Sequence, residues 1–221
     1  MNLTTQNARG LPALFVIIAL GLLVAACSSS DEIEPEPTPT PVATAEEGDG
    51  PRGMVLGDSA QAPDFELIDD EGNPFRLSDH HGRVIAMFFG YTFCPDICPL
   101  TLMHMSHAKE VLGDQADDAL FLFVTVDPER DTPEQLQRYM ARADHNAIGL
   151  TGDPDTLAQV WEDYSIAVDV EPRDDGSYLI GHSAQVWLID PDGHLAMILP
   201  PSADGDDLAN DVRWLINGSS S

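Results

Sequence analysis

Two runs of consecutive apolar residues constrain the fold of this chain more than any other feature. Residues 84–90 read Val-Ile-Ala-Met-Phe-Phe-Gly, and residues 119–126 read Ala-Leu-Phe-Leu-Phe-Val-Thr-Val. Strands that are apolar on both faces are typical of a parallel sheet that is covered by helices. We therefore expect these runs to be buried strands at the centre of such a sheet.

Helical patterns alternate with the strands. At one helix start Thr132 can act as the cap, Pro133 suits the first helical position, and Gln135 can complete a capping box. The expected helices cover about 97–112, the residues after Pro133, the residues after Pro154, and about 205–216.

Two hairpins complete the expected fold. The first turns at 69–72 and joins apolar segments within 65–77, and the second turns at 191–193 and joins 184–190 to 194–199. Strands that alternate with helices, followed by a hairpin and a last helix, predict an α/β domain of three layers with a central mixed sheet.

The N-terminal segment has the features of an export signal. Its apolar run, from Leu11 to Ala26, is short for a helix that spans a bilayer but long enough for the core of a signal peptide. The run ends in Val-Ala-Ala before Cys27, and this resembles a bacterial lipoprotein signal. We expect residues 1–26 to be a lipoprotein signal peptide and Cys27 to be lipidated, with an uncleaved membrane anchor as the alternative. In either case we expect an exported protein on the outer face of the cytoplasmic membrane.

A polar segment separates this signal from the folded part. Residues 27–53 are acidic and rich in proline, so they bury too little apolar surface to fold, and alternating prolines favour an extended spacer. We expect a disordered linker over 27–53, a folded domain over 54–217 and a short tail over 218–221.

The charge balance excludes one class of function. The chain has 38 acidic and 10 basic residues and a formal net charge of −28, so it has no basic face with which to neutralise phosphates. Nucleic-acid binding is therefore not expected. A negative field favours cationic partners or metal ions, or serves only to keep the surface solvated.

Cys94 and Cys98 lie where a buried strand ends and a helix begins. Open α/β sheets bind ligands at this edge, and a helix N-terminus stabilises thiolate over thiol. The four-residue spacing places both sulfurs on one side of a helical turn, where they could form a disulfide or bind one metal ion. Thiolates are soft ligands, and Cu(I) suits them well.

An imidazole would complete such a site for Cu(II). His182 lies just before the strand expected from residue 184, although a single histidine at a strand start is more often structural. His104 and His107 could bind copper, but they lie one to three helical turns from the thiols, so a packing or surface role is favoured. The remaining histidines are expected in a polar turn, at the surface or in a hairpin strand: His80, His81, His145 and His194.

Four stretches together resemble the Sco/SenC family of copper proteins, which take part in the assembly of cytochrome c oxidase. The most specific element is Cys-Pro-Asp-Ile-Cys-Pro with a distal histidine. The resemblance implies a thioredoxin-like fold, an exported and membrane-anchored protein, and copper, as Cu(I) or Cu(II), on Cys94, Cys98 and His182. The matching stretches, in family order, are 89–99, 126–133, 149–152 and 182–193.

The chain departs from the family pattern beside the histidine. The family commonly has an aspartate before it, whereas this chain has Gly181, so a carboxylate that would orient the imidazole is missing there. The segment 200–207 is also unusually acidic. The loop 127–131 has two interpretations: support for the site or contact with a partner, or a loop ordered by Arg130 pairing and by helix capping.

Four functions remain open from the residues. The first is a metallochaperone that passes copper to the copper-bearing subunit of cytochrome c oxidase, with other copper chaperones or thiol reductases as further partners. The second is a thiol–disulfide oxidoreductase in which Cys94 and Cys98 are the redox pair and reduce the cysteines of the oxidase copper site. A peroxidase and a domain with a structural disulfide are the others. Three residues between the cysteines, where thioredoxins have two, and the absence of proline from 178–188 favour metal binding.

Overall fold

The computed structural model describes residues 50–57, 60–142 and 147–218. The predicted signal peptide, Cys27, nearly all of the predicted linker and His145 lie outside the described residues. Within the described ranges, none of the helices has the length and apolar character needed to cross a membrane.

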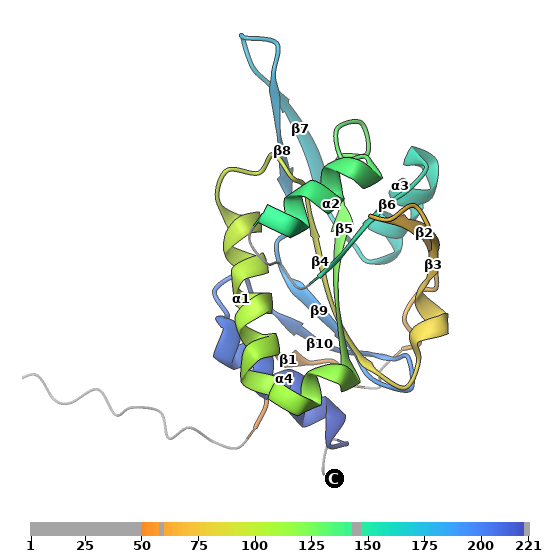
Figure 1. Ribbon diagram of the computed structural model, residues 1–221, viewed down its shortest axis with the longest axis vertical. Helices are drawn as coiled ribbons and strands as arrows, with labels where there is room; N and C mark the ends of the chain where they lie inside the picture. Colours follow the sequence, from red (N-terminus) through yellow and green to blue (C-terminus); the bar gives the residue numbers. More distant parts are fainter. Residues whose placement is uncertain (1–49, 58–59, 143–146, 219–221) are drawn as a thin grey trace, which may run out of the picture. The chain divides into compact units, whose positions relative to one another are not determined.

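An eight-stranded mixed sheet forms the centre of the domain (Figure 1). Its central strands β4 and β5 run parallel and in register, and β6 continues the parallel set beside β5. The other neighbours are antiparallel. In spatial order the strands are β1 (Met54–Val55), β10 (Leu195–Leu199), β9 (Val186–Ile189), β4 (Val84–Gly90), β5 (Ala119–Thr125), β6 (Ile148–Thr151), β2 (Glu66–Asp69) and β3 (Pro74–Arg76).

The two central strands are fully buried. Every residue of β4 and of β5 lies in the core, as the continuous apolar runs predict. Phe88 faces one side of the sheet, where Phe123 packs against Tyr139 of α2, whereas Phe89 faces the other side and packs against Tyr164. The sheet therefore has cores on both faces.

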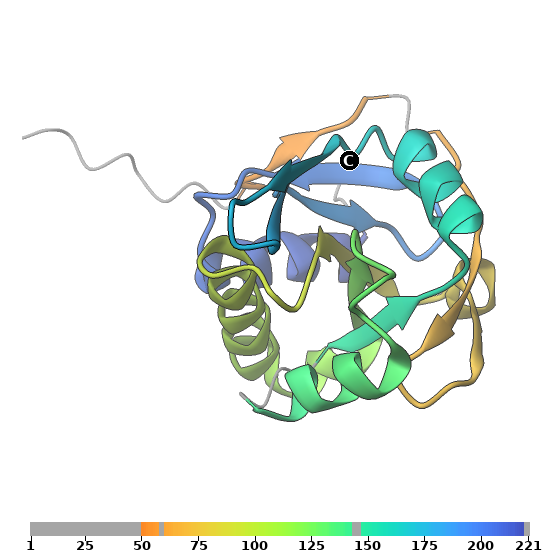
Figure 2. The ribbon, with the colours of Figure 1, turned by 90° about the horizontal axis from the view of Figure 1, so that it is seen from above.

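Helices cover both faces of the sheet, which confirms the predicted three layers (Figures 1 and 2). Helices α1, α2 and α4 lie on one side, and α3, which ends beside Tyr164, lies on the other. Two short 3-10 segments, η1 (Leu77–His80) and η2 (Gly113–Asp118), join the elements. The helices are α1 (Ile97–Leu112), α2 (Pro133–Arg142), α3 (Pro154–Asp163) and α4 (Gly205–Ile216).

The start of α2 differs in one detail from its prediction. The hydroxyl of Thr132 accepts a hydrogen bond from the backbone N–H of Gln135 at 3.3 Å, as a cap should. The side chain of Gln135, however, donates to Oγ1 of Thr92 at 3.0 Å, in the segment before the cysteines. Gln135 therefore connects the helix to the cysteine loop, which we define as residues 91–96.

A second, two-stranded sheet was not predicted. It consists of β7 (Val168–Pro172) and β8 (Tyr178–His182), which pair with each other in antiparallel register. This hairpin extends away from the rest of the domain at the top of Figure 1. His182 precedes β9, as expected, with residues 183–185 between them. It is also the last residue of β8, a strand that was not predicted.

Candidate metal centre

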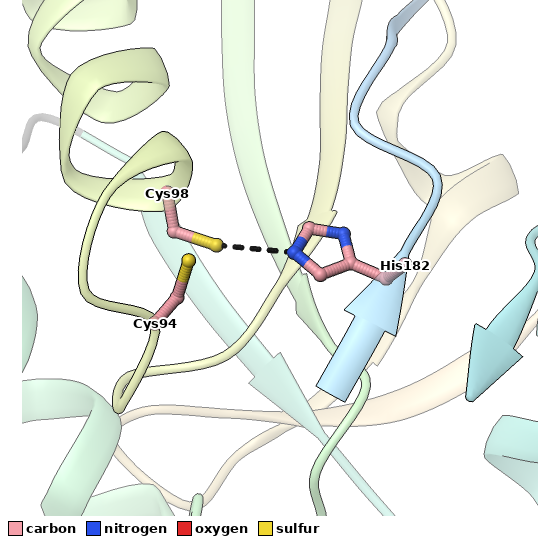
Figure 3. Close-up of side chains that lie close together, drawn as sticks. All are labelled: Cys94, Cys98 and His182. Atoms are coloured by element: carbon pink, nitrogen blue, oxygen red, sulfur yellow. Dashed lines mark hydrogen bonds between the residues drawn. The ribbon is translucent and has the colours of Figure 1, made fainter. Parts of the chain in front are cut away.

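The structure brings together three side chains from two separate parts of the fold. Cys94 lies in the cysteine loop after β4, Cys98 is the second residue of α1, and His182 ends β8. Their sulfur and nitrogen atoms all lie within 4.8 Å of one another, and Sγ of Cys98 is 3.4 Å from Nε2 of His182 (Figure 3). Two sulfurs and one nitrogen at these separations could bind a single metal ion.

A glycine at the end of β4 makes room for the buried thiol. Cys98 is completely buried, and a Cβ atom added to Gly90 would lie 2.8 Å from its sulfur and 2.8 Å from the ring of Phe123. No real Cβ approaches other atoms so closely, because van der Waals repulsion rises steeply at that distance. The first turn of α1 can therefore lie directly against the strand.

The ring of His182 is oriented by the backbone. Its Nδ1 lies 2.9 Å from the carbonyl oxygen of Ser183. A carbonyl only accepts hydrogen bonds, so Nδ1 carries the proton and Nε2 directs its lone pair toward the sulfurs. The rings of Phe88 and Tyr91 pack edge-on against the imidazole at 6.0 and 5.8 Å. Ser183 thus supplies an acceptor for the imidazole, although the neighbouring position 181 is a glycine.

The two thiols differ strongly in acidity. The pKa of Cys94 falls to about 4, chiefly because the Cys98 thiol donates a hydrogen bond to its sulfur, with further help from the backbone N–H groups of Asp96 and Cys98. Burial raises the pKa of Cys98, and the neighbouring Cys94 raises it further. At neutral pH the pair therefore holds one thiolate, on the partly exposed Cys94, and one thiol, on the buried Cys98.

A cleft opens over the site. Its volume is about 310 Å³, and its walls come from the cysteine loop, the start of α1 and the hairpin. Cys94 and His182 line it together with Asp96 and Glu171. Because two acidic residues line the cleft together with the thiolate, the cleft favours a cation over an anion.

The other histidines have different partners. His104 contacts the carbonyl oxygen of Ala203 at 3.1 Å, and His107 contacts Asp206 at 3.2 Å, which confirms their packing or surface role. His81 is exposed, whereas His80 stacks on Phe75 at 4.4 Å and is less solvated than expected. His194 pairs with Asp190 at 3.4 Å. Among the described residues, Cys94, Cys98 and His182 form the one group of three with suitable spacing for a metal.

The loop 127–131 is ordered partly as predicted. Arg130 pairs with Asp127, and Thr132 caps α2. Asp131 does not lie at the cap: its carboxylate accepts hydrogen bonds from the backbone N–H and the hydroxyl of Thr92, in the cysteine loop. Sequence reasoning missed Thr92, and the signal available was its position two residues before Cys94.

Comparison with known proteins identifies the family. The family model described as SCO1/SenC matches residues 55–217. This chain belongs to the SCO1/SenC family. Its domain is thus a thioredoxin-like Sco domain with a mixed central sheet, which confirms the resemblance found in the motifs.

Individual relatives cover the same domain. The SCO2-like protein of Rickettsia felis is 38% identical over 132 residues, which are 59% of this chain and 64% of that protein. The structure of Bradyrhizobium japonicum ScoI with copper bound is 33% identical, has a TM-score of 0.66 and covers 71% of this chain and 99% of that one. The apo Sco1 protein of Thermus thermophilus is 31% identical with a TM-score of 0.68, covering 75% of this chain and 97% of that one. This Sco chain thus spans somewhat less than two thirds of the Rickettsia relative.

Proposed function

We propose that this Sco protein binds one copper ion on Cys94, Cys98 and His182 and delivers it to, or matures, the binuclear copper site of cytochrome c oxidase. The observation that carries the proposal is the convergence of the three ligand atoms within 4.8 Å. The copper-bound ScoI of Bradyrhizobium japonicum, at 33% identity over nearly its whole length, supports copper as the cargo.

The ligand set suits both oxidation states. Two thiolates alone can bind Cu(I) in a nearly linear arrangement, whereas Cu(II) prefers more ligands with nitrogen among them. Cys94 needs no deprotonation at neutral pH because its pKa is about 4. Cys98 must release its proton when the metal binds, so copper binding should release a proton to solvent.

The burial of the ligands suits transfer by ligand exchange. Cys98 is buried, but Cys94 and His182 are partly exposed and line the open cleft. A recipient's ligands would therefore reach the copper from the cleft, on the side of Cys94 and His182. Cys98 would still bind the copper from the side of the core.

The N-terminal segment supports delivery at a membrane surface. Lipidation of Cys27 would anchor an exported protein to the outer face of the cytoplasmic membrane, and the proline-rich linker would separate the domain from that surface. Both features would bring the domain near a membrane-bound oxidase subunit.

Copper titration of single variants tests the ligand assignment. Cys94→Ser and Cys98→Ser should each lose the one-to-one stoichiometry, because a hydroxyl is a poor ligand for Cu(I). His182→Ala should retain Cu(I) and lose most Cu(II) binding, with a changed Cu(II) absorption spectrum. Wild-type stoichiometry and spectrum in either cysteine variant would show that the site is misassigned.

A second candidate function rests on the unequal acidity of the two thiols. The Cys94 thiolate could attack a partner disulfide, forming a mixed disulfide and releasing one partner thiolate. Cys98 would then lose its proton and attack Cys94, which releases the second partner thiolate and leaves a Cys94–Cys98 disulfide. An external dithiol reductase would have to reduce that disulfide for the next cycle.

Gene deletion separates the two functions. Loss of the gene should lower cytochrome c oxidase activity under copper limitation. Added copper should partly restore the activity if delivery is the main role, because a higher copper concentration can load the oxidase by mass action without the chaperone. Added small thiol, and not copper, should restore it if thiol reduction is the main role. Normal oxidase assembly in the deletion strain would contradict both.

A further inference from the structure

The hairpin that carries His182 is not part of the main sheet. Strands β7 and β8 pair only with each other among the described strands, whereas β4 and α1, which position the cysteines, belong to the main domain core. The backbone ladder therefore does not fix the imidazole relative to the sulfurs. Side chains must join the hairpin to the cysteine loop if the three ligands are to meet.

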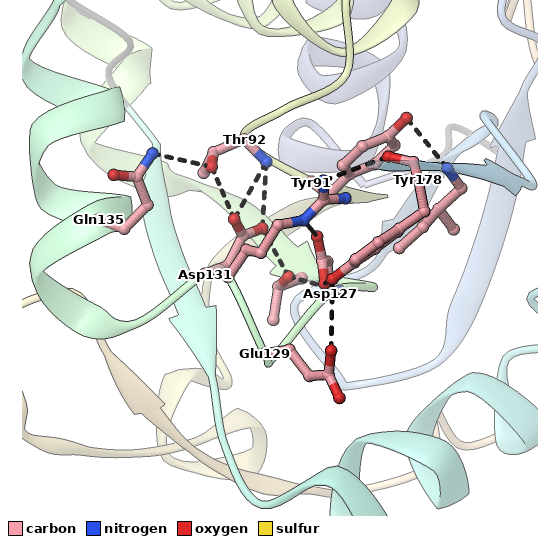
Figure 4. A network of polar contacts seen from close by, with 10 residues as sticks. Tyr91, Thr92, Asp127, Glu129, Asp131, Gln135 and Tyr178 are labelled. Carbon is pink, nitrogen blue, oxygen red and sulfur yellow. Dashed lines mark hydrogen bonds and ion pairs between the residues drawn. The ribbon is translucent and has the colours of Figure 1, made fainter. Parts of the chain in front are cut away.

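Arg130 contacts the hairpin through Tyr178, the first residue of β8. The guanidinium carbon lies 3.6 Å from the centroid of the Tyr178 ring, and Nη1 donates a hydrogen bond to the Tyr178 carbonyl oxygen at 3.2 Å. Arg130 also pairs with Asp127, whose other carboxylate oxygen accepts a hydrogen bond from the Tyr178 hydroxyl at 2.8 Å. Figure 4 shows this network around Tyr178 and Asp127.

The same guanidinium contacts the cysteine loop. It lies 4.8 Å from the centroid of the Phe93 ring and 5.6 Å from that of Tyr91. The hydroxyl of Tyr91 in turn accepts a hydrogen bond from the backbone N–H of Ile180 at 3.2 Å, two residues before His182. Arg130 therefore lies between aromatic rings of both segments that carry ligands.

The loop that carries Arg130 is itself fixed. The next residue, Asp131, is completely buried, and its carboxylate accepts hydrogen bonds from Thr92 Oγ1 at 2.6 Å and from Thr125 Oγ1 at 2.7 Å. These contacts tie the loop to the end of β5 and to the cysteine loop. Arg130 thus contacts the hairpin from a loop that the hydrogen bonds of Asp131 hold in place.

Ion pairing alone does not account for an arginine here. Within the described chain, Nη2 of Arg130 is buried and has no hydrogen-bond partner, which is unfavourable. A lysine could pair with Asp127 and leave fewer buried donors. Only the planar guanidinium can stack on a ring and donate to a carbonyl at the same time, so stacking against the hairpin is the feature that lysine would lose.

We propose that Arg130 is a positioning residue that holds the His182 hairpin against the cysteine loop and so sets the imidazole relative to the two sulfurs. Where copper is the readout, the proposal rests on the function proposed above. It then predicts an effect on Cu(II), which needs the imidazole, and little effect on Cu(I), which the sulfurs can bind alone.

The first test uses the full chain without metal. Arg130→Lys keeps the charge but loses the stacking geometry, and Arg173→Lys, at an exposed position in the same hairpin, is the matched control. Hydrogen exchange of the Ile180 amide should be faster in Arg130→Lys and unchanged in the control, while β4 and β5 stay protected in both. Wild-type exchange at Ile180 would overturn the proposal.

A second variant guards against general destabilisation. Tyr178→Leu removes the ring on which Arg130 stacks and should also accelerate exchange at Ile180. If Arg130→Lys loses protection in β4 and β5 as well, Tyr178→Leu decides the matter: slow exchange at Ile180 in that variant would overturn the proposal.

The second test measures copper. Arg130→Lys should weaken Cu(II) binding by about 10- to 100-fold, as for other groups that orient a metal ligand, and leave Cu(I) affinity near the wild-type value. The double variant Arg130→Lys/His182→Ala should bind Cu(II) no more weakly than His182→Ala alone, because both changes remove the same ligand. Fully additive losses would overturn the proposal. If His182→Ala itself binds Cu(II) like the wild type, the ligand assignment fails instead, and the metal-free exchange still decides the role of Arg130.

Discussion

Nε2 of His182 lies 3.4 Å from Sγ of Cys98, although 84 positions separate the two residues in the sequence. The contact joins the end of a two-stranded hairpin to the first turn of a core helix. Separately, the Cys98 thiol donates a hydrogen bond to the Cys94 sulfur, so the acidity of the partly exposed cysteine depends on the buried one.

Cys94 should react with iodoacetamide well below neutral pH in the metal-free, reduced protein. Its pKa is lowered to about 4, first by the hydrogen bond from Cys98, so the thiolate is the main form at any higher pH. The alkylation rate, followed by mass spectrometry, should stay nearly constant as the pH falls and drop only near pH 4. Cys98 should stay unmodified because it is buried and its pKa is raised.

Cys98→Ala is the control for that experiment. It removes the thiol that donates to Cys94, so the midpoint of the Cys94 alkylation profile should move to higher pH. An unchanged profile would mean that the helix N-terminus, and not Cys98, is what stabilises the thiolate.

Gly90→Ala should destabilise the fold and disturb the metal centre. The new Cβ would lie 2.8 Å from Sγ of Cys98, and overpacking of a filled core costs about 1–3 kcal/mol. Urea unfolding should show this loss, and copper titration should show weaker binding. In Gly57→Ala the added Cβ meets nothing within 4 Å, so its unfolding free energy should stay within about 0.5 kcal/mol of the wild type. Equal stability of the two variants would contradict the packing argument.

Asp131 should make the fold less stable as the pH rises. Burial raises the pKa of this carboxyl above its usual value of 3.8, so the folded protein keeps a proton that the unfolded chain has already released. By linkage, its contribution to stability is lost as the pH rises from the unfolded pKa through the folded pKa. The unfolding free energy of Asp131→Asn should therefore improve relative to the wild type as the pH rises above 3.8. The opposite trend would show that Thr92 and Thr125 favour the anion more than burial disfavours it.

Gly181→Asp should be less stable than Gly181→Asn. Position 181 lies directly opposite Asp169 in the β7–β8 ladder, and an added Cβ has ordinary contacts of 3.8 Å or more, so space is not limiting. Like charges on opposite strands repel, and the difference should be roughly 0.2–1 kcal/mol at low salt. Urea unfolding in low and high salt checks this, because salt should remove a difference that arises from charge.

Cys27→Ser should leave an uncleaved precursor if the N-terminal segment is a lipoprotein signal. The physical basis is that lipid attachment needs the thiol of that residue. Mass spectrometry of the membrane fraction would detect the unprocessed chain. Normal processing of the variant would refute the lipoprotein interpretation.

Much of the fold followed from local patterns. The continuous apolar runs predicted β4 and β5, and helical periodicity predicted α1 and α4 with their observed bounds. These elements bury whole faces, so a run or a periodic pattern of apolar residues within the segment is enough to predict them.

The hairpin β7–β8 could not be predicted in this way. Most residues of β7 face solvent, so the strand has no buried face to produce a clear alternation. That His182 ends a strand was therefore missed, although its place before β9 was expected and its role as a candidate ligand came from the family motif.

The contacts that Arg130 and Asp131 make also could not be predicted from local sequence patterns. One of the two interpretations of the loop 127–131 was an ion pair of Arg130 together with helix capping. That Asp131 binds Thr92 depends on β4 and β5 ending side by side, and that Arg130 stacks on Tyr178 depends on a hairpin that was not foreseen. Such contacts arise from tertiary packing between residues that are distant in sequence.

The separation of the β7–β8 hairpin from the main sheet has a consequence for the order in which copper bonds would break. Displacing the imidazole would break side-chain contacts such as that between Arg130 and Tyr178, but no backbone bond of the eight-stranded sheet, whereas Cys98 cannot move without disturbing the core. A recipient could thus replace the nitrogen first while both sulfurs still held the ion. Dissociation would proceed stepwise, and the free ion would never have to enter the solvent.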